Sequence, residues 1–160
     1  MEFGTEIKVR GDVQMIIKHD DGKEEVIEFP NTILVTGRNA LASSLANSFN
    51  QTYEFYINRM LFGIGGTDGG GNKKVVSPNR NGLYSQLVSK SVISAVDPNV
   101  PSQVVFTSVL PANDVATNNQ VLNEMALQMA TGDLYSMVTF PNLTKTPTMQ
   151  IVFNWRLSFI

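Results

Sequence analysis

The stretch MQIVFNWRLSF, residues 149–159, indicates the fold most clearly because apolar and polar side chains alternate along it. Every odd-numbered position is apolar, whereas Gln150, Asn154, Arg156 and Ser158 occupy even positions. A period of two is typical of a β-strand with one buried face and one face toward solvent. The pattern predicts a strand over residues 149–159 with Trp155 packed in the core.

The N-terminal part of the chain repeats this period. Apolar side chains alternate with polar ones over residues 7–17, and Gly11 interrupts the apolar series, which predicts a bulge. The sequence His-Asp-Asp-Gly at residues 19–22 is a strong turn signal, and residues 24–29 resume an extended pattern beyond it. We therefore expect an N-terminal hairpin.

Between these two regions the sequence predicts several short strands and one helix. Alanine and leucine recur at helical spacing over residues 38–47, which indicates a helix of about three turns. Extended segments separated by Pro, Gly and Asn are expected at residues 32–35, 83–93, 103–110, 122–128 and 133–140. Seven or eight strands without regular helix alternation favour an antiparallel β-sandwich or barrel, and we expect the sandwich. The expected organisation is a single domain over residues 1–160, with residues 1–30 as an N-terminal hairpin extension.

Composition excludes several classes of function. The 160 residues carry 12 Lys and Arg against 14 Asp and Glu, so the net charge of −2 argues against a nucleic-acid partner. The absence of cysteine excludes disulfides and thiolate chemistry, and a single histidine disfavours the common metal sites and catalytic triads. Without a signal peptide or an apolar run long enough for a membrane span, we expect a soluble protein that is not exported and has no membrane partner.

Six of the twelve glycines gather in residues 63–71. Such a loop can bind phosphate, but this one lacks the G-x-G-x-x-G spacing and no helical pattern begins after it. We interpret it as a flexible or interface loop, with Gly63, Gly65, Gly66 and Gly69 as interface candidates. No cofactor is expected.

The acidic residues offer two alternatives to a purely structural role. Asp20, Asp21 and Glu24 could approach a calcium ion, but the order of an EF-hand loop is absent and a hairpin turn explains them, with His19 as a surface residue. Glu124 with Asp133 or Asp114 could serve glycoside hydrolysis, although a buried hydrogen-bonding role is equally open to Glu124. We assign no catalytic and no metal-binding residues.

Two further features bear on binding. Residues 104–110 place apolar side chains on both faces of one strand, which makes Val105 and Val109 interface candidates, together with the C-terminal Ile160. Tyr84 and Tyr135 could stack on a sugar beside the glycine loop, whereas Trp155 belongs to the apolar face of its strand.

Four segments occur in an order that resembles a group of small structural proteins of tailed bacteriophages. They are Asn-Thr-Ile-Leu-Val-Thr-Gly-Arg at residues 31–38, Phe-Gly-Ile-Gly-Gly-Thr at 62–67, Asn-Glu-Met-Ala-Leu at 123–127, and residues 140–159 with their Lys-Thr pair and Trp-x-x-x-Phe ending. The match covers residues 31–159. The resemblance implies a β-sandwich virion subunit, present in several copies and without catalytic activity, at the neck, the tail or the capsid surface.

These observations predict a non-enzymatic structural protein that forms homo-oligomers and contacts other virion proteins, assembled in the bacterial host cytoplasm. Low charge and two-sided apolar strands suit a subunit whose exposed edges are covered by neighbours. The alternative is a receptor- or carbohydrate-binding module of a phage tail or head appendage, in which Tyr84, Tyr135 and the glycine loop form a shallow site.

Overall fold

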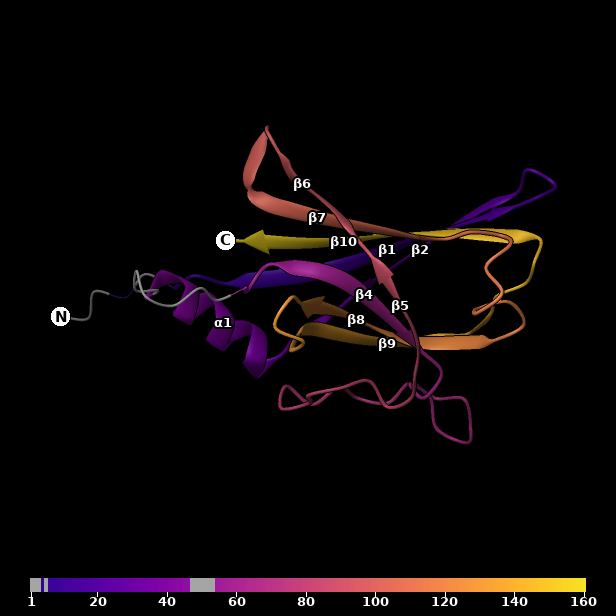
Figure 1. Ribbon diagram of the computed structural model, residues 1–160, viewed down its shortest axis with the longest axis horizontal. Coiled ribbons are helices and arrows are strands. Elements are labelled where there is room, and N and C mark those ends of the chain that lie inside the picture. Colours follow the sequence, from indigo (N-terminus) through magenta and orange to yellow (C-terminus); the bar gives the residue numbers. More distant parts are fainter. Residues whose placement is uncertain (1–3, 5, 47–53) are drawn as a thin grey trace.

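The computed structural model, which describes residues 4, 6–46 and 54–160, is a sandwich of two antiparallel five-stranded sheets with one short helix (Figure 1). The first sheet, sheet A, has the order β2-β1-β10-β7-β6, and the second, sheet B, has the order β3-β9-β8-β4-β5. The strands of sheet A are β1 (Val9–His19), β2 (Glu24–Pro30), β6 (Ile93–Asp97), β7 (Val100–Leu110) and β10 (Met149–Phe159). Those of sheet B are β3 (Thr32–Ile33), β4 (Ile57–Gly63), β5 (Gln86–Ser91), β8 (Val121–Met129) and β9 (Leu134–Thr144).

The predicted C-terminal strand is confirmed as β10, with the bounds that its alternation indicated. β10 lies in the middle of sheet A, where it pairs with β1 along eleven residues and with β7 on its other side. The side chains of Ile151, Phe153, Trp155 and Leu157 point into the space between the sheets and are buried. The strand pattern therefore places the main core correctly.

The predicted N-terminal hairpin is also confirmed, and it is continuous with the sandwich. β1 and β2 pair around a turn in which Gly22 has φ 90°, and β1 is the neighbour of β10. The register of β1 on β10 runs through Gly11 without a shift, so the expected bulge is wrong. A Cβ atom at Gly11 would lie 1.9 Å from the side chain of Asn31, so a larger residue here would displace that side chain.

Both flanks of the sandwich are formed by strands that pass from one sheet to the other. Asn31 alone separates β2 in sheet A from β3 in sheet B, and Val92 alone separates β5 in sheet B from β6 in sheet A. The predicted single strand over residues 83–93 is thus part of a longer extended segment that forms two strands in different sheets. Together with β4, which was not predicted as a strand, this brings the count in the described residues to ten. Bends of this kind form the corners of sandwiches.

Asn31 fixes the first of these corners. The side-chain amide is oriented so that both its nitrogen and its oxygen have hydrogen-bond partners. In this orientation the nitrogen donates to the carbonyl of Gly11 at 2.8 Å. Its oxygen accepts from the indole nitrogen of Trp155 at 2.7 Å and from the hydroxyl of Ser136 at 3.2 Å. One side chain therefore links β1, β10 and β9, and it provides the partner that a buried indole N–H requires.

The single helix, α1 (Val35–Leu45), begins three residues before the predicted start at residue 38. The predicted end, Asn47, lies outside the described residues. Gly37 allows the helix to pack closely on β9, because a Cβ atom there would lie 2.3 Å from the carbonyl oxygen of Tyr135. Thr36 donates from its hydroxyl to the carbonyl of Leu134. Within the described ranges, no helix has the length and apolar character needed to cross a bilayer.

The sandwich contains a second, smaller core outside sheet B. The long connection between β4 and β5, residues 64–85, runs across the outer face of this sheet and is visible below it in Figure 1. It covers an apolar cluster formed by Leu34, Leu61, Ala126, Leu134 and Met137, against which Val76, Leu83 and Tyr84 pack. Sheet B is therefore buried on both faces, whereas none of the described residues forms such a cover on the outer face of sheet A.

Candidate functional site

The glycine-rich segment and the Asn-Glu pair of β8 meet at one end of the sandwich. Glu124 is fully buried, and its carboxylate accepts three backbone hydrogen bonds. The amides of Gly65 and Ser85 donate to Oε1 at 2.9 and 2.7 Å, and the amide of Tyr84 donates to Oε2 at 2.8 Å. Glu124 thus fixes both ends of the connection that covers sheet B.

Three of the glycines are required by this contact. A Cβ atom at Gly63 would lie 2.5 Å from Glu124 Oε1, one at Gly65 would lie 2.7 Å from the amide of Ser85, and one at Gly66 would lie 2.2 Å from the carbonyl of Asn123. Gly63 and Gly66 are buried by their own chain, whereas Gly69 is exposed with open space around it. Of the four glycine interface candidates, Gly69 is therefore the one whose surroundings are open.

The neighbouring Asn123 extends the network. Its Oδ1 accepts from the amide of Gly66 at 2.6 Å, and its Nδ2 donates to Thr67 Oγ1 at 2.9 Å and to Asn142 Oδ1 at 3.0 Å. The Thr67 hydroxyl also donates to Asn142 at 2.9 Å. Segments 62–67 and 123–127, far apart in the sequence, form one polar cluster here, which was not predicted because spacing alone does not show which loops meet.

The acidic residues proposed as a hydrolase pair are not brought together. Asp133 is exposed in the β8–β9 turn, at the opposite end of β8 from Glu124. Asp114 lies in the β7–β8 loop, where Lys90 contacts it at 2.9 Å and the Thr117 hydroxyl donates to it at 2.9 Å. Both oxygens of Glu124 accept backbone amides, so the structural role that the sequence left open is the one observed.

A buried lysine stabilises the same end of the molecule. Lys145 has no exposed surface, and its ammonium donates to Asn118 Oδ1 at 2.6 Å and to the carbonyl of Thr146 at 3.1 Å. Desolvation lowers its pKa from the usual 10.5, and the negative charge of Asp114 opposes part of that shift. Lys145 therefore acts as an internal donor for the loop formed by residues 111–120.

The pKa of Asp114 lies below its usual 3.8. Burial alone would raise this pKa, but the hydrogen bonds from Lys90 and Thr117 and the positive charge of Lys90 outweigh it. Asp114 is thus held as an anion that joins β5 to the β7–β8 loop. These contacts fix the β7–β8 loop in place, and they show that Asp114 does not pair with Glu124.

The residues weighed as a calcium site form a turn instead. Asp21 accepts from the amide of Lys23 at 2.8 Å, and His19 Nε2 lies 2.8 Å from Glu25 Oε2. The hydrogen bond with His19 and the charge of Lys23 lower the pKa of Glu25 below 4.5. The part of the chain that the structure describes contains no group of three or more His, Asp or Glu side chains able to hold a metal ion.

The two tyrosines considered for sugar binding lie on opposite faces of sheet B. Tyr135 belongs to the main core and is buried, which raises its pKa above 10.0. Tyr84 packs on the outer face, where the guanidinium of Arg80 and the ammonium of Lys74 cover its ring at 3.7 and 4.4 Å. The predicted shallow site that combines both rings with the glycine loop is therefore not formed. Trp155, as expected, is a core residue.

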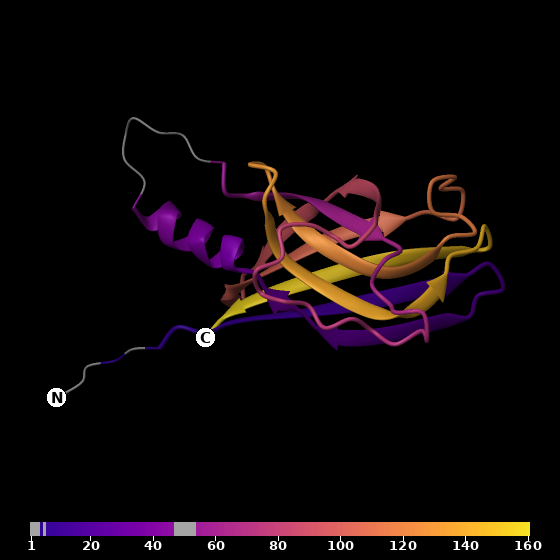
Figure 2. The same cartoon turned by 90° about the horizontal axis from the view of Figure 1, so that it is seen from below.

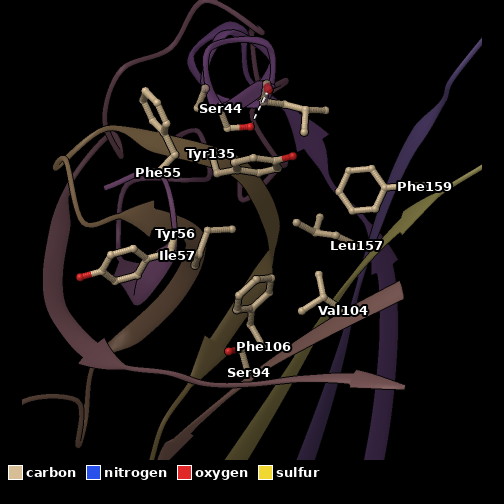
Figure 3. A pocket seen from close by; sticks show the side chains of 12 residues that line it. Ser44, Phe55, Tyr56, Ile57, Ser94, Val104, Phe106, Tyr135, Leu157 and Phe159 are labelled. Atoms are coloured by element: carbon tan, nitrogen blue, oxygen red, sulfur yellow. Dashed lines mark hydrogen bonds between the residues drawn. The ribbon is translucent and has the colours of Figure 1, made fainter. Parts of the chain in front are cut away.

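The opposite end of the sandwich is open and apolar. A cavity of about 590 Å³ lies between the sheets. Figure 3 shows aromatic side chains from several elements that converge on it. Its walls include Phe55 and Tyr56 before β4, Phe106 on β7, Tyr135 on β9 and Phe159 on β10. Helix α1 lies over one side and contributes Ala40, Leu41 and Ser44. None of the described residues that line this cavity is charged.

A second apolar hollow of about 760 Å³ adjoins the two chain ends. Ile7 and Ile160 line it together with Ile33 and Leu41, and Arg10 and Arg38 lie at its border. Ile160, an interface candidate, is 66% exposed, and its backbone pairs with that of Lys8 through bonds of 2.6 and 2.8 Å. Figure 2 shows α1 and the C-terminus at this end. The sequence did not predict that these segments meet at one end of the sandwich.

The outer face of sheet A carries the other two interface candidates. Val105 is half-buried and Val109 is exposed, and both lie on the face that no other layer covers. Cross-strand pairing places Val109 beside Val152, Val152 beside Ile16 and Ile16 beside Val26, which makes one apolar row across four strands. Neighbouring rows are polar, with Asn154 bonded to Thr107 at 2.9 Å and to Gln14 at 3.1 Å.

Comparison with known proteins gives no family to which the chain can be assigned. No protein-family model, no curated protein and no solved structure matches it.

Proposed function

We propose that this chain is a non-catalytic structural subunit of a tailed-bacteriophage virion, which assembles with copies of itself and with other virion proteins at the neck, the tail or the capsid surface. The proposal starts from the order of the four sequence segments that resemble such proteins. The geometry of the described residues adds an independent physical reason.

The observation that carries the proposal is the distribution of polar and apolar groups. The buried carboxylate of Glu124 and the buried ammonium of Lys145 have partners within the chain. In contrast, large apolar side chains are exposed around the open end, among them Ile7 at 73%, Leu45 at 85%, Tyr56 at 59% and Ile160 at 66%. Large apolar patches that are exposed on a protein mark contact sites with other proteins, and several such side chains at one end favour a contact site there.

The polar clusters also favour an interaction protein, because their side chains already have hydrogen-bond or ion-pair partners within the chain. Glu124, Asn123 and Asp114 each hold loops in place through short hydrogen bonds or an ion pair. A catalytic acid or base needs a free position facing a substrate. Because these polar groups bond within the chain, they stabilise the fold, and the exposed apolar surfaces remain available for assembly.

The test is the composition of purified particles from the phage that encodes the chain. Peptide mass spectrometry is expected to find the protein in the particles in multiple copies, and a tag at one terminus is expected to label a fixed position in electron micrographs. Particles that lack the protein would contradict the proposal. A specific signal on a glycan array would favour the receptor-binding alternative instead.

A further inference from the structure

The hairpin formed by β6 and the first half of β7, residues 93–104, is largely exposed. We refer to it as the β6–β7 ribbon. All residues of β6 except Asp97 are exposed, and Ile93, Val96 and Val100 are exposed by 78%, 58% and 43%. The ribbon extends away from sheet B in Figure 1. Two strands without a covering layer have little stability of their own.

The edge of the ribbon has few of the features that prevent pairing with another strand: β6 is short and its register on β7 shifts between Val96 and Asp97, but residues 93–96 are extended and uncharged. β6 is the last strand of sheet A and pairs only with β7, and its outward backbone groups have no backbone partner among the described residues. The opposite edge strand, β2, carries Glu24, Glu25 and Glu28, whereas β6 has no charged residue before Asp97. Charges on an edge protect it, and an uncharged apolar edge invites pairing.

The ribbon continues into the open apolar cavity. Ser94 and Val104 belong to the ribbon and also line the cavity of about 590 Å³. Twelve residues of the ribbon adjoin six residues of the cavity wall that are at least partly exposed, which makes 18 in all; the six are Leu41, Ser44, Phe55, Tyr56, Ile57 and Phe159. A specific interface of standard size uses roughly 20–30 residues on each side. The surface therefore approaches the size of a standard contact.

We propose that β6 pairs antiparallel with β6 of a second copy of this chain, so that sheet A continues from one subunit into the next and the partner covers the cavity mouth. The charges favour a second copy as the occupant. A two-fold arrangement centred on Ala95 places each Asp97 beside the other copy's Ile93 and away from the other Asp97. The same arrangement at β2 gathers six glutamates along one seam, where like charges repel.

A two-fold contact has a further consequence for growth. Because each copy uses the same edge, the pairing closes at two subunits and does not extend into a fibre. The inference deepens the proposed function, since it names the first contact made by a subunit that assembles with itself. Larger assemblies then use the remaining apolar surfaces, at the outer face of sheet A and around Ile160.

The test compares two valine-to-lysine variants on the two edge strands of sheet A. Val96→Lys adds a charge to β6, where the valine is 58% exposed, and Val26→Lys adds the same charge to β2, where it is 54% exposed. Native mass spectrometry and light scattering are expected to find dimers of the wild type and of Val26→Lys, and monomers of Val96→Lys. Circular dichroism checks that both variants keep the sandwich.

Hydrogen exchange adds a readout that is specific for strand pairing. In the wild-type dimer, the outward amides of β6 are expected to exchange at least tenfold more slowly than in Val96→Lys, while the amides of β10 remain equally protected. A wild-type dimer that survives Val96→Lys, or that Val26→Lys disrupts, would overturn the β6 contact and leave the proposed function standing. A wild type that is monomeric and absent from purified particles would overturn both.

Discussion

The two ends of the sandwich bury different kinds of groups. Around Glu124 and Lys145, charged side chains without any exposed surface are satisfied by backbone amides, carbonyls and one asparagine of the same chain. Around α1 and Ile160, the chain leaves aromatic and aliphatic side chains facing a cavity that opens to solvent. β4 joins the two ends, since Ile57 borders the open cavity and Gly63 contacts Glu124.

This difference separates folding from assembly within one small domain. A buried polar group without a partner costs stability directly, so the end near Glu124 needs its own chain to be correctly folded. An exposed apolar surface costs little in the monomer and becomes favourable when another protein covers it. We therefore expect substitutions at the first end to lower the free energy of unfolding, and substitutions at the second to change association.

The largest effect is expected for Glu124→Ala. Removing the carboxylate leaves the amides of Gly65, Tyr84 and Ser85 without their acceptor, and each buried unsatisfied group costs roughly 1–3 kcal/mol. Urea denaturation is expected to show a loss of about 3–5 kcal/mol in the free energy of unfolding. Glu124→Gln, which keeps one oxygen acceptor, serves as the matched control and should lose less. Equal stability of Glu124→Ala and the wild type would show that the carboxylate does not fix the connection.

The next effect concerns two glycines of the same segment. Gly66→Ala places a methyl group 2.2 Å from the carbonyl of Asn123, whereas Gly69→Ala adds one to open space. The first substitution is expected to cost about 2–3 kcal/mol because backbone must shift, and the second should change stability by less than about 0.5 kcal/mol. Thermal unfolding of both variants checks this. Similar melting temperatures would mean that the segment adapts and that close approach does not explain Gly66.

The sequence predicts the part of the fold that depends on local periodicity. β10 and the first hairpin could be predicted from the alternation in residues 149–159 and the turn at residues 19–22. The pattern of apolar and polar residues within one strand is enough to show which of its side chains are buried. Asn31 and Val92 could not be recognised as corners. Nothing in a single extended segment shows that its two halves pair with different sheets.

The site was less predictable than the fold for a related reason. Glu124 is conspicuous in the sequence because it is an acid within an apolar strand. A buried hydrogen-bonding role was one of the two interpretations that the sequence allowed for it, the other being glycoside hydrolysis. Its partners, the amides of Gly65, Tyr84 and Ser85, are backbone groups, and backbone groups leave no mark in a sequence. The cavity wall around Phe55 likewise combines residues from six separate segments.

A smaller effect is expected from the ion pair of Asp114. Its pKa is lowered in the folded state, so the unfolded chain binds more protons as the pH falls toward 3.8, and the folded state loses this stabilisation on passing through the lower pKa. Asp114→Asn should lower the free energy of unfolding by about 1–2 kcal/mol at pH 7. Urea titrations from pH 7 to pH 2 should show this difference between wild type and variant shrinking in acid. A difference that stays constant with pH would assign the loss to packing instead of charge.

The smallest effect on stability, and the sharpest test of the comparison, is expected for Ile160→Ser at the open end. Ile160 is 66% exposed, and its bonds to Lys8 use only the backbone, which the substitution retains. The free energy of unfolding of a dilute sample should therefore change by less than about 0.5 kcal/mol, while binding of a fluorescent apolar dye to the open end should fall. Ile151→Ser is the matched control, because this isoleucine lies on β10, the strand that ends just before Ile160, and has no exposed surface, so its loss should cost several kcal/mol. A large loss for Ile160→Ser would mean that the open end contributes to the fold of the single chain, and the division between a folding end and an assembly end would no longer hold.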